Sequence, residues 1–107
     1  MARGVYVVRT RAVAPEREDE LDDWYDHVHI PELLAVPGFV SARRFRRVGG
    51  DDGDGVENLA IYEIDADDLS APVRELRRRS AAGETTPATA LQLDPPPVVG
   101  LYEELDR

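Results

Sequence analysis

The residues best able to do chemistry lie in one short segment. Trp24, Tyr25, His27 and His29 fall within eight residues that end at Pro31, and they include the only Trp and both His of the chain. His is the commonest general acid or base because its pKa lies near neutrality. We therefore predict a small-molecule site here, with His29 as the candidate catalytic residue. The same side chains would also suit a well-packed helix in which His29 caps the last carbonyls.

The elements around this segment are expected in the order β-α-β-β-α-β. Apolar residues recur at spacings of three and four from Leu21 to Val28, which predicts an amphipathic helix. Alternating or β-branched runs predict the strands. The expected strands cover residues 4–11, 39–48, 57–64 and 98–105, and the expected helices cover residues 15–30 and 67–82.

Pro31 should end the first helix, because a proline disfavours helical geometry at the residue before it. A short second helical piece over residues 31–36 can then follow. An end at this point places His29 at a helix C-terminus, which favours a protonated imidazole. Tyr25 lies on the same side as His29, whereas His27 lies about 200° away around a helix. The two His therefore cannot bind one metal while the helix persists, and no metal is expected.

Two further segments read as connections. Residues 83–97 hold four Pro and little periodicity, which predicts a long surface connection that could wrap a neighbouring subunit. Residues 49–55 are rich in Gly and Asp and resemble a calcium loop in composition alone, since the Glu required at the twelfth position is missing. The whole chain, residues 1–107, is expected to form one domain.

The one basic cluster lies on the second expected strand and contains Arg43, Arg44, Arg46 and Arg47. Alternation turns Arg44 and Arg46 toward one face of the sheet and Arg43 toward the other. An Arg on a covered face needs an anionic partner. For Arg44 this partner is either one of the protein's own carboxylates or a substrate carboxylate or enolate.

Aromatic residues supply the remaining candidates for ligand binding. Tyr6, Tyr62 and Tyr102 lie on three different expected strands and could present hydroxyls to an apolar cavity. Trp24 and Tyr25 belong to the apolar stripe of the first helix. They are expected to pack in the core, with the Tyr25 hydroxyl as a further candidate for ligand contact.

Both faces of the expected sheet are substantially apolar. Val5, Val7, Leu59 and Ile61 would lie opposite the face that contains Tyr62. Two helices can cover only one face of a four-stranded sheet, so the other is expected to associate with a second copy of the chain. We therefore predict a homodimer in which two sheets pack face to face.

Composition excludes several classes of function. The 22 acidic and 13 basic residues give a net charge of −9, which disfavours binding to nucleic acid and to anionic membranes. The chain contains no Cys and no Lys, which excludes thiolate chemistry and a Lys Schiff base. No phosphate-binding Gly loop or dinucleotide motif is present, so no cofactor is expected. The absence of a long apolar run predicts a soluble, cytoplasmic protein.

The sequence W-Y-D-x-x-H-I-P-x-L-L-x-x-P-G-F-x-x-A-x-R-F, residues 24–45, resembles the dimeric α/β-barrel superfamily. Within it the chain looks most like the EthD-like small proteins and their uncharacterised actinobacterial relatives. The resemblance covers the first half of the chain well and the second half by topology alone. It implies a ferredoxin-like α+β protomer, a homodimer built through the sheets, and a pocket beside or between the sheets.

Two functions follow from these observations. The superfamily includes polyketide cyclases, isomerases, cofactor-free quinone-forming monooxygenases, haem-handling proteins and members without known activity. The first expectation is a cofactor-independent enzyme for a hydrophobic, oxygenated molecule such as an aromatic polyketide, a quinol or a lactone. His29 would then move a proton, while Arg44 and a Tyr would stabilise the resulting enolate. The alternative is a non-catalytic homodimeric binding or accessory protein.

Overall fold

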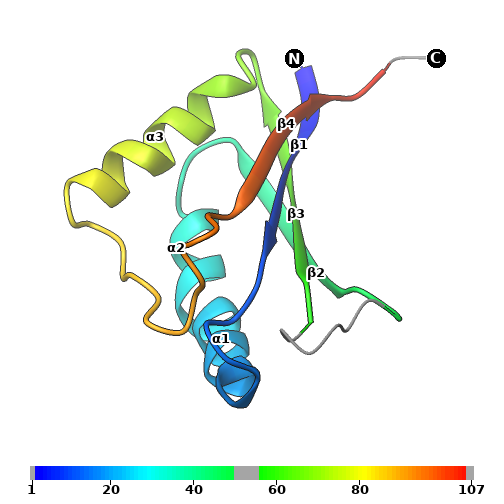
Figure 1. The fold of residues 1–107 in the computed structure, drawn as a ribbon. Coiled ribbons are helices and arrows are strands. Elements are labelled where there is room, and N and C mark those ends of the chain that lie inside the picture. Colours follow the sequence, from blue (N-terminus) through cyan, green and yellow to red (C-terminus); the bar gives the residue numbers. More distant parts are fainter. Residues whose placement is uncertain (1, 50–55, 106–107) are drawn as a thin grey trace.

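The computed structural model describes residues 2–49 and 56–105, which form a four-stranded sheet with a single layer of helices on one side of it (Figure 1). The expected β-α-β-β-α-β order is confirmed. The calcium-like loop falls mainly on residues 50–55 and so lies outside the described residues. The elements are β1 (Ala2–Thr10), η1 (Pro15–Arg17), α1 (Glu18–Trp24), η2 (Tyr25–His29), α2 (Ile30–Leu34), β2 (Phe39–Arg46), β3 (Asn58–Ala66), α3 (Ser70–Ala81) and β4 (Val98–Glu103).

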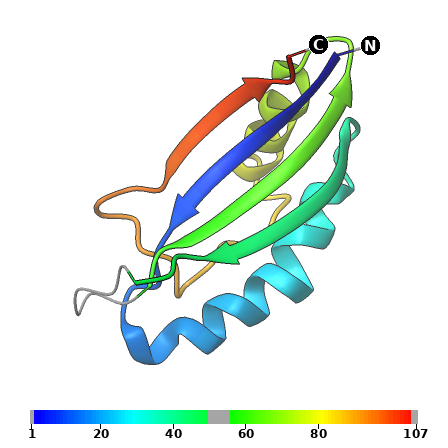
Figure 2. The ribbon, with the colours of Figure 1, turned by 90° about the vertical axis from the view of Figure 1, so that its right-hand side faces the viewer.

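The sheet is antiparallel throughout, with the strand order β2-β3-β1-β4. This is the ferredoxin-like α+β arrangement. All helices lie behind the sheet in Figure 2, and its other face is left open. Tyr6 pairs with Tyr62 across β1 and β3, and Val5 pairs with Tyr102 across β1 and β4. Since successive residues of a strand point to opposite faces, Tyr102 lies on the face opposite to Tyr6 and Tyr62.

The core lies between the sheet and the helices. Leu21, Leu33 and Val36 are buried from the helical layer, and Tyr62 and Ile64 are buried from the central strand β3. Each such aliphatic side chain stabilises the fold by about 1.5–3 kcal/mol. α3 adds Val73 to this core, with Leu69 and Leu76 packed against it. The core therefore fixes the first helix on the sheet at the segment that carries the candidate residues.

Pro31 does not break the first helix, so that prediction was wrong. α1, η2 and α2 form one continuous helix, and Ile30 keeps α geometry with φ −61° and ψ −47°. The reason is the π turn η2, in which the N–H of Ile30 donates to the carbonyl of Tyr25 five residues earlier. The wider turn accommodates the proline ring and its missing N–H. His29 therefore lies in the middle of a helix, on a turn of altered geometry.

Gly38 allows the chain to turn from this helix into β2. Its φ of +103° belongs to the region that side chains disfavour. A Cβ at this position would also overlap the ring of Pro72 in α3. The Pro37-Gly38 boundary expected from the sequence is therefore required both by backbone conformation and by the packing of α3.

The connection between α3 and β4 folds back over its own chain. Ala12 forms a bridge with Leu91, and this contact is flanked by hydrogen bonds from Val13 N–H to the Ala90 carbonyl (2.7 Å) and from Gln92 N–H to the Arg11 carbonyl (2.8 Å). This connection thus covers the helical layer of its own protomer. In the part of the chain that the structure describes, no helix is long and apolar enough to cross a membrane.

Candidate functional site

A pocket of about 340 Å³ lies between the first helix, α3 and the connection that follows α3. Trp24, His29 and Glu32 line it from the first helix, and α3 contributes Leu76, Arg77 and Ser80. The connection supplies the outer wall, over residues 85–88, 91 and 93. Its volume lies within the range of small-molecule sites, and most of its walls are apolar. We therefore take this pocket as the candidate functional site.

His29 lies in this pocket within a set of aromatic rings. Its imidazole stacks on the indole of Trp24, with ring centroids 4.4 Å apart and planes 13° apart. The edges of Tyr25 and Tyr62 complete the surroundings, at centroid distances of 5.6 and 6.0 Å. Within the described residues, His29 makes these ring contacts but no hydrogen bond. The sequence placed Tyr25 and His29 on one side of the helix, and the structure confirms that they touch.

Burial lowers the pKa of His29 from 6.5 to about 4, while the nearby Glu32 carboxylate raises it slightly. The expectation of a protonated imidazole is therefore wrong. Its premise was a helix end at His29, but the helix continues to Leu34, so His29 does not lie at the negative end of the helix dipole. At neutral pH the ring is uncharged, so one nitrogen can accept a hydrogen bond or a proton and the other can donate.

Thr86, in the connection, holds the outer wall of the pocket. Its backbone N–H and its hydroxyl both donate to the carboxylate of Glu32, each at 2.9 Å. Its carbonyl accepts a hydrogen bond from the indole N–H of Trp24, at 3.0 Å. We call these three hydrogen bonds the Thr86 clasp. The sequence analysis assigned no role to Glu32 in this pocket and none to Thr86, and no local pattern pairs residues 54 positions apart.

The tyrosines predicted as ligand contacts are mostly core residues. Tyr25 is buried, its hydroxyl shares a hydrogen bond of 2.9 Å with that of Thr10, and burial raises its pKa. Tyr6 stacks with Tyr62 at 6.3 Å between ring centroids. Tyr62 is fully buried, burial raises its pKa strongly, and its hydroxyl has no partner among the described residues. Tyr102 lies on the open face, so the three strand tyrosines do not converge on one cavity.

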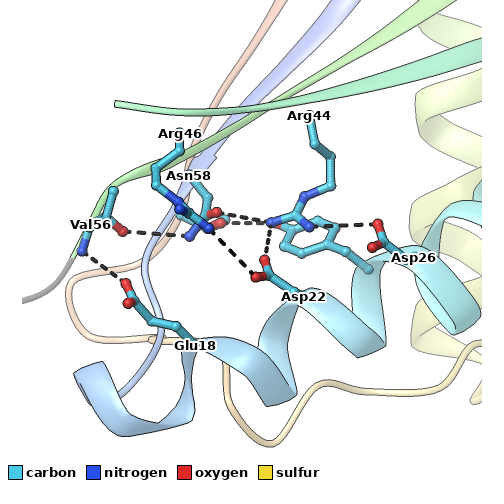
Figure 3. Close-up of polar contacts among 9 residues, drawn as sticks. Glu18, Asp22, Asp26, Arg44, Arg46, Val56 and Asn58 are labelled. Carbon is cyan, nitrogen blue, oxygen red and sulfur yellow. Dashed lines mark hydrogen bonds and ion pairs between the residues drawn. The ribbon is translucent and has the colours of Figure 1, made fainter. Parts of the chain in front are cut away.

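Arg44 is bound by the protein's own side chains (Figure 3). One of its terminal nitrogens lies 2.9 Å from both Asp22 and Asn58, and the other lies 3.6 Å from Asp26. Its guanidinium also lies over the ring of Tyr25, at 4.2 Å from the centroid. Alternation placed Arg44 and Arg46 on one face of the sheet, and in the structure this is the face toward the helices. Its cationic charge is thus met by carboxylates of the first helix, one of the two partners that the sequence left open.

His27 lies outside the pocket and is exposed, as the sequence favoured. It lines a second, open hollow of about 490 Å³, together with Asp23 and Val28. Trp24 and Pro87 line both hollows, so they form the wall between them. The two His therefore face different spaces. Over residues 2–49 and 56–105, no group of three or more His, Cys, Asp or Glu is placed to hold a metal ion.

Two known structures with the same fold are described as monooxygenases. One is a monooxygenase from the gene ActVA-Orf6 of Streptomyces coelicolor in complex with nanaomycin D (16% identity, TM-score 0.55, 99% of this chain and 90% of that one). Another is the "putative monooxygenase" of Shewanella loihica PV-4 (17% identity, TM-score 0.57, 100% of this chain and 99% of that one). At such identities the likeness shows the fold alone.

The sequence comparisons add no family. No protein-family model matches the sequence, and no curated protein matches it either. The resemblance to the EthD-like proteins therefore stays a prediction.

Proposed function

We propose that the protein is a small-molecule enzyme of the oxygenase type, with its site in the pocket that contains His29. The observation that carries this proposal is an uncharged imidazole at the wall of an apolar pocket of ligand size. Proteins of the same fold that bear the name monooxygenase, one of them in complex with nanaomycin D, support it. The proposed substrate is a hydrophobic phenolic compound with a ring CH2 group, such as an aromatic polyketide of the anthrone type.

In the proposed reaction, O2 oxidises a ring CH2 group of the substrate to C=O. One oxygen atom enters the product and the other leaves as water. Electron transfer from a phenolic substrate to O2 makes the phenol hydroxyl a strong acid, so an imidazole with a pKa of about 4 can accept its proton. His29 is the proposed acceptor. Arg44 holds the first helix against the sheet in this proposal, because Asp22 and Asp26 already engage its charge.

We expect His29→Ala to lower kcat at least about 100-fold, the usual effect of removing a general base. The measurement is O2 consumption with a panel of anthrones, with 18O2 incorporation followed by mass spectrometry. His27→Gln is the matched control, since it removes the other imidazole of the same helix and should keep wild-type rates. Absence of oxygen uptake across the panel, or equal rates for wild type and His29→Ala, would contradict the proposal.

A non-catalytic binding protein is the second candidate. In enzymes a catalytic His is commonly oriented by a hydrogen bond from a third group. In the described part of the chain no group hydrogen-bonds to His29, which favours this alternative. A phenolic ligand that binds equally well to wild type and His29→Ala and is recovered unchanged in air would support it.

We further propose that two copies of the chain pair through their open sheet faces. Val5, Val7, Leu59 and Ile61 form the centre of this face. Tyr102 and Val98, at the edge strand β4, are also exposed on it. Apolar side chains that gather on an open sheet face are a common feature of association surfaces. The pocket of His29 lies on the other side of the sheet, so its walls belong to one protomer.

A further inference from the structure

The Thr86 clasp uses every polar group of one residue. The N–H and the hydroxyl of Thr86 each donate to Glu32, and its carbonyl accepts from Trp24. Because both carboxylate oxygens of Glu32 are engaged, the side chain is held in one orientation. The clasp therefore fastens the connection to the first helix at one point of the pocket wall.

The indole of Trp24 links the Thr86 clasp to His29. The indole N–H of Trp24 is fixed by the Thr86 carbonyl, and the face of the same indole stacks on the imidazole at 4.4 Å. In the described residues the imidazole makes no hydrogen bond of its own. Its orientation thus depends on ring contacts, and Trp24 is the one contact tied to the connection.

We propose that Glu32 and Thr86 are positioning residues, which hold the imidazole of His29 at the pocket wall through the indole of Trp24. The clasp also holds Trp24, which together with Pro87 lines both this pocket and the hollow beside His27. The inference rests on the proposed function only in assigning the chemistry to His29. The position of the two rings can be measured without any substrate.

A second, similar contact on the same connection supplies the control. The hydroxyl of Thr89 donates to Glu20 of α1 at 2.8 Å, but neither residue lines the pocket of His29. Glu32→Ala and Glu20→Ala each remove a carboxylate that fastens the connection to the first helix. Only Glu32→Ala removes the hydrogen bonds that hold Thr86, the residue whose carbonyl accepts from Trp24.

The readouts are the ring-proton resonances of His29, which lie in the ring current of Trp24, and the fluorescence of this only Trp. At pH 8 the imidazole is neutral, so changes report on position alone. We expect Glu32→Ala to move the His29 resonances toward those of an exposed His and to shift Trp24 emission to the red. We also expect it to lower kcat about tenfold with little change in KM, as for a loss of orientation.

Glu32→Gln should restore the wild-type signals, since an amide can accept from the Thr86 N–H and donate to its hydroxyl. Thr86→Val, which removes one of the three hydrogen bonds, should give a smaller shift and serves if Glu32→Ala does not fold. Equal His29 and Trp24 signals in Glu32→Ala and Glu20→Ala would overturn the inference. If no substrate is turned over, the proposed function fails, and the spectra still decide the positioning role.

Discussion

At the scale of single residues, burial of His29 determines its protonation state. The folded state holds it neutral, with a pKa of about 4, whereas an unfolded chain would give about 6.5. The contribution of neutral His29 to the unfolding free energy is therefore at its maximum above pH 6.5 and is lost as the pH falls toward 4. We expect a loss of about 2 kcal/mol between pH 7 and pH 4.5, measured as the unfolding free energy in urea. His29→Gln should lack this part of the pH dependence.

NMR titration tests the same prediction directly, because the chain has two His and His27→Gln assigns their resonances. A His29 midpoint near 6.5, or equal pH dependence of stability in wild type and His29→Gln, would contradict it. The same protonation should abolish activity below about pH 4, where the imidazole can no longer accept a proton.

At the scale of elements, Arg44 connects the first helix to β2. Its side chain is 17% exposed and is paired with Asp22, whereas that of Arg46 is 68% exposed and lies 3.8 Å from the same carboxylate. Removing one partner of a mostly buried ion pair leaves the other charge unpaired. We expect Arg44→Ala to lower the unfolding free energy by about 2–3 kcal/mol, and Arg46→Ala by less than about 0.5 kcal/mol. Equal losses in the two variants would show that Arg44 does not hold the helix.

The sequence predicted the helices and strands best, because hydrophobic periodicity indicates which face of each element is buried. Leu21, Tyr25 and Val73 are buried as expected, and Tyr62 lies on the covered face of β3. The prediction failed at Pro31. A helix end was expected before the proline, but a π turn accommodates its ring and the helix continues. That one error also led to the wrong charge state for His29.

The site was predictable only in part. His29 and Trp24 could be found because rare residue types cluster in one short segment. Glu32 and Thr86 could not, because they meet through a long connection whose path has no periodic signal. Arg44 was expected to need an anionic partner, but the sequence could not choose between a substrate and one of the protein's own carboxylates, since that choice depends on which side chains the helix register places beside it.

At the scale of the whole molecule, the open sheet face carries its own charge pattern. Arg9 lies toward one end of this face and Glu63 toward the other, while Arg43 pairs with Ile61 at the centre and Asp65 is already ion-paired with Arg3. A twofold axis at the centre of the face can therefore set Arg9 of one copy toward Glu63 of the other. Such an arrangement adds charge complementarity to the apolar centre and favours the pairing of identical chains.

Ile61 lies at the centre of the open face, on the central strand β3 and pointing away from the helices. We expect the wild type to elute in size-exclusion chromatography with light scattering at roughly twice its chain mass of 11.9 kDa, as a dimer. Ile61→Lys should elute as a folded monomer, because a buried charge without a partner opposes the contact. Val48→Lys is the matched control, since Val48 is 95% exposed and lies beyond the end of β2. A monomeric wild type, or equal masses for both variants, would mean that the open face does not bind a second copy.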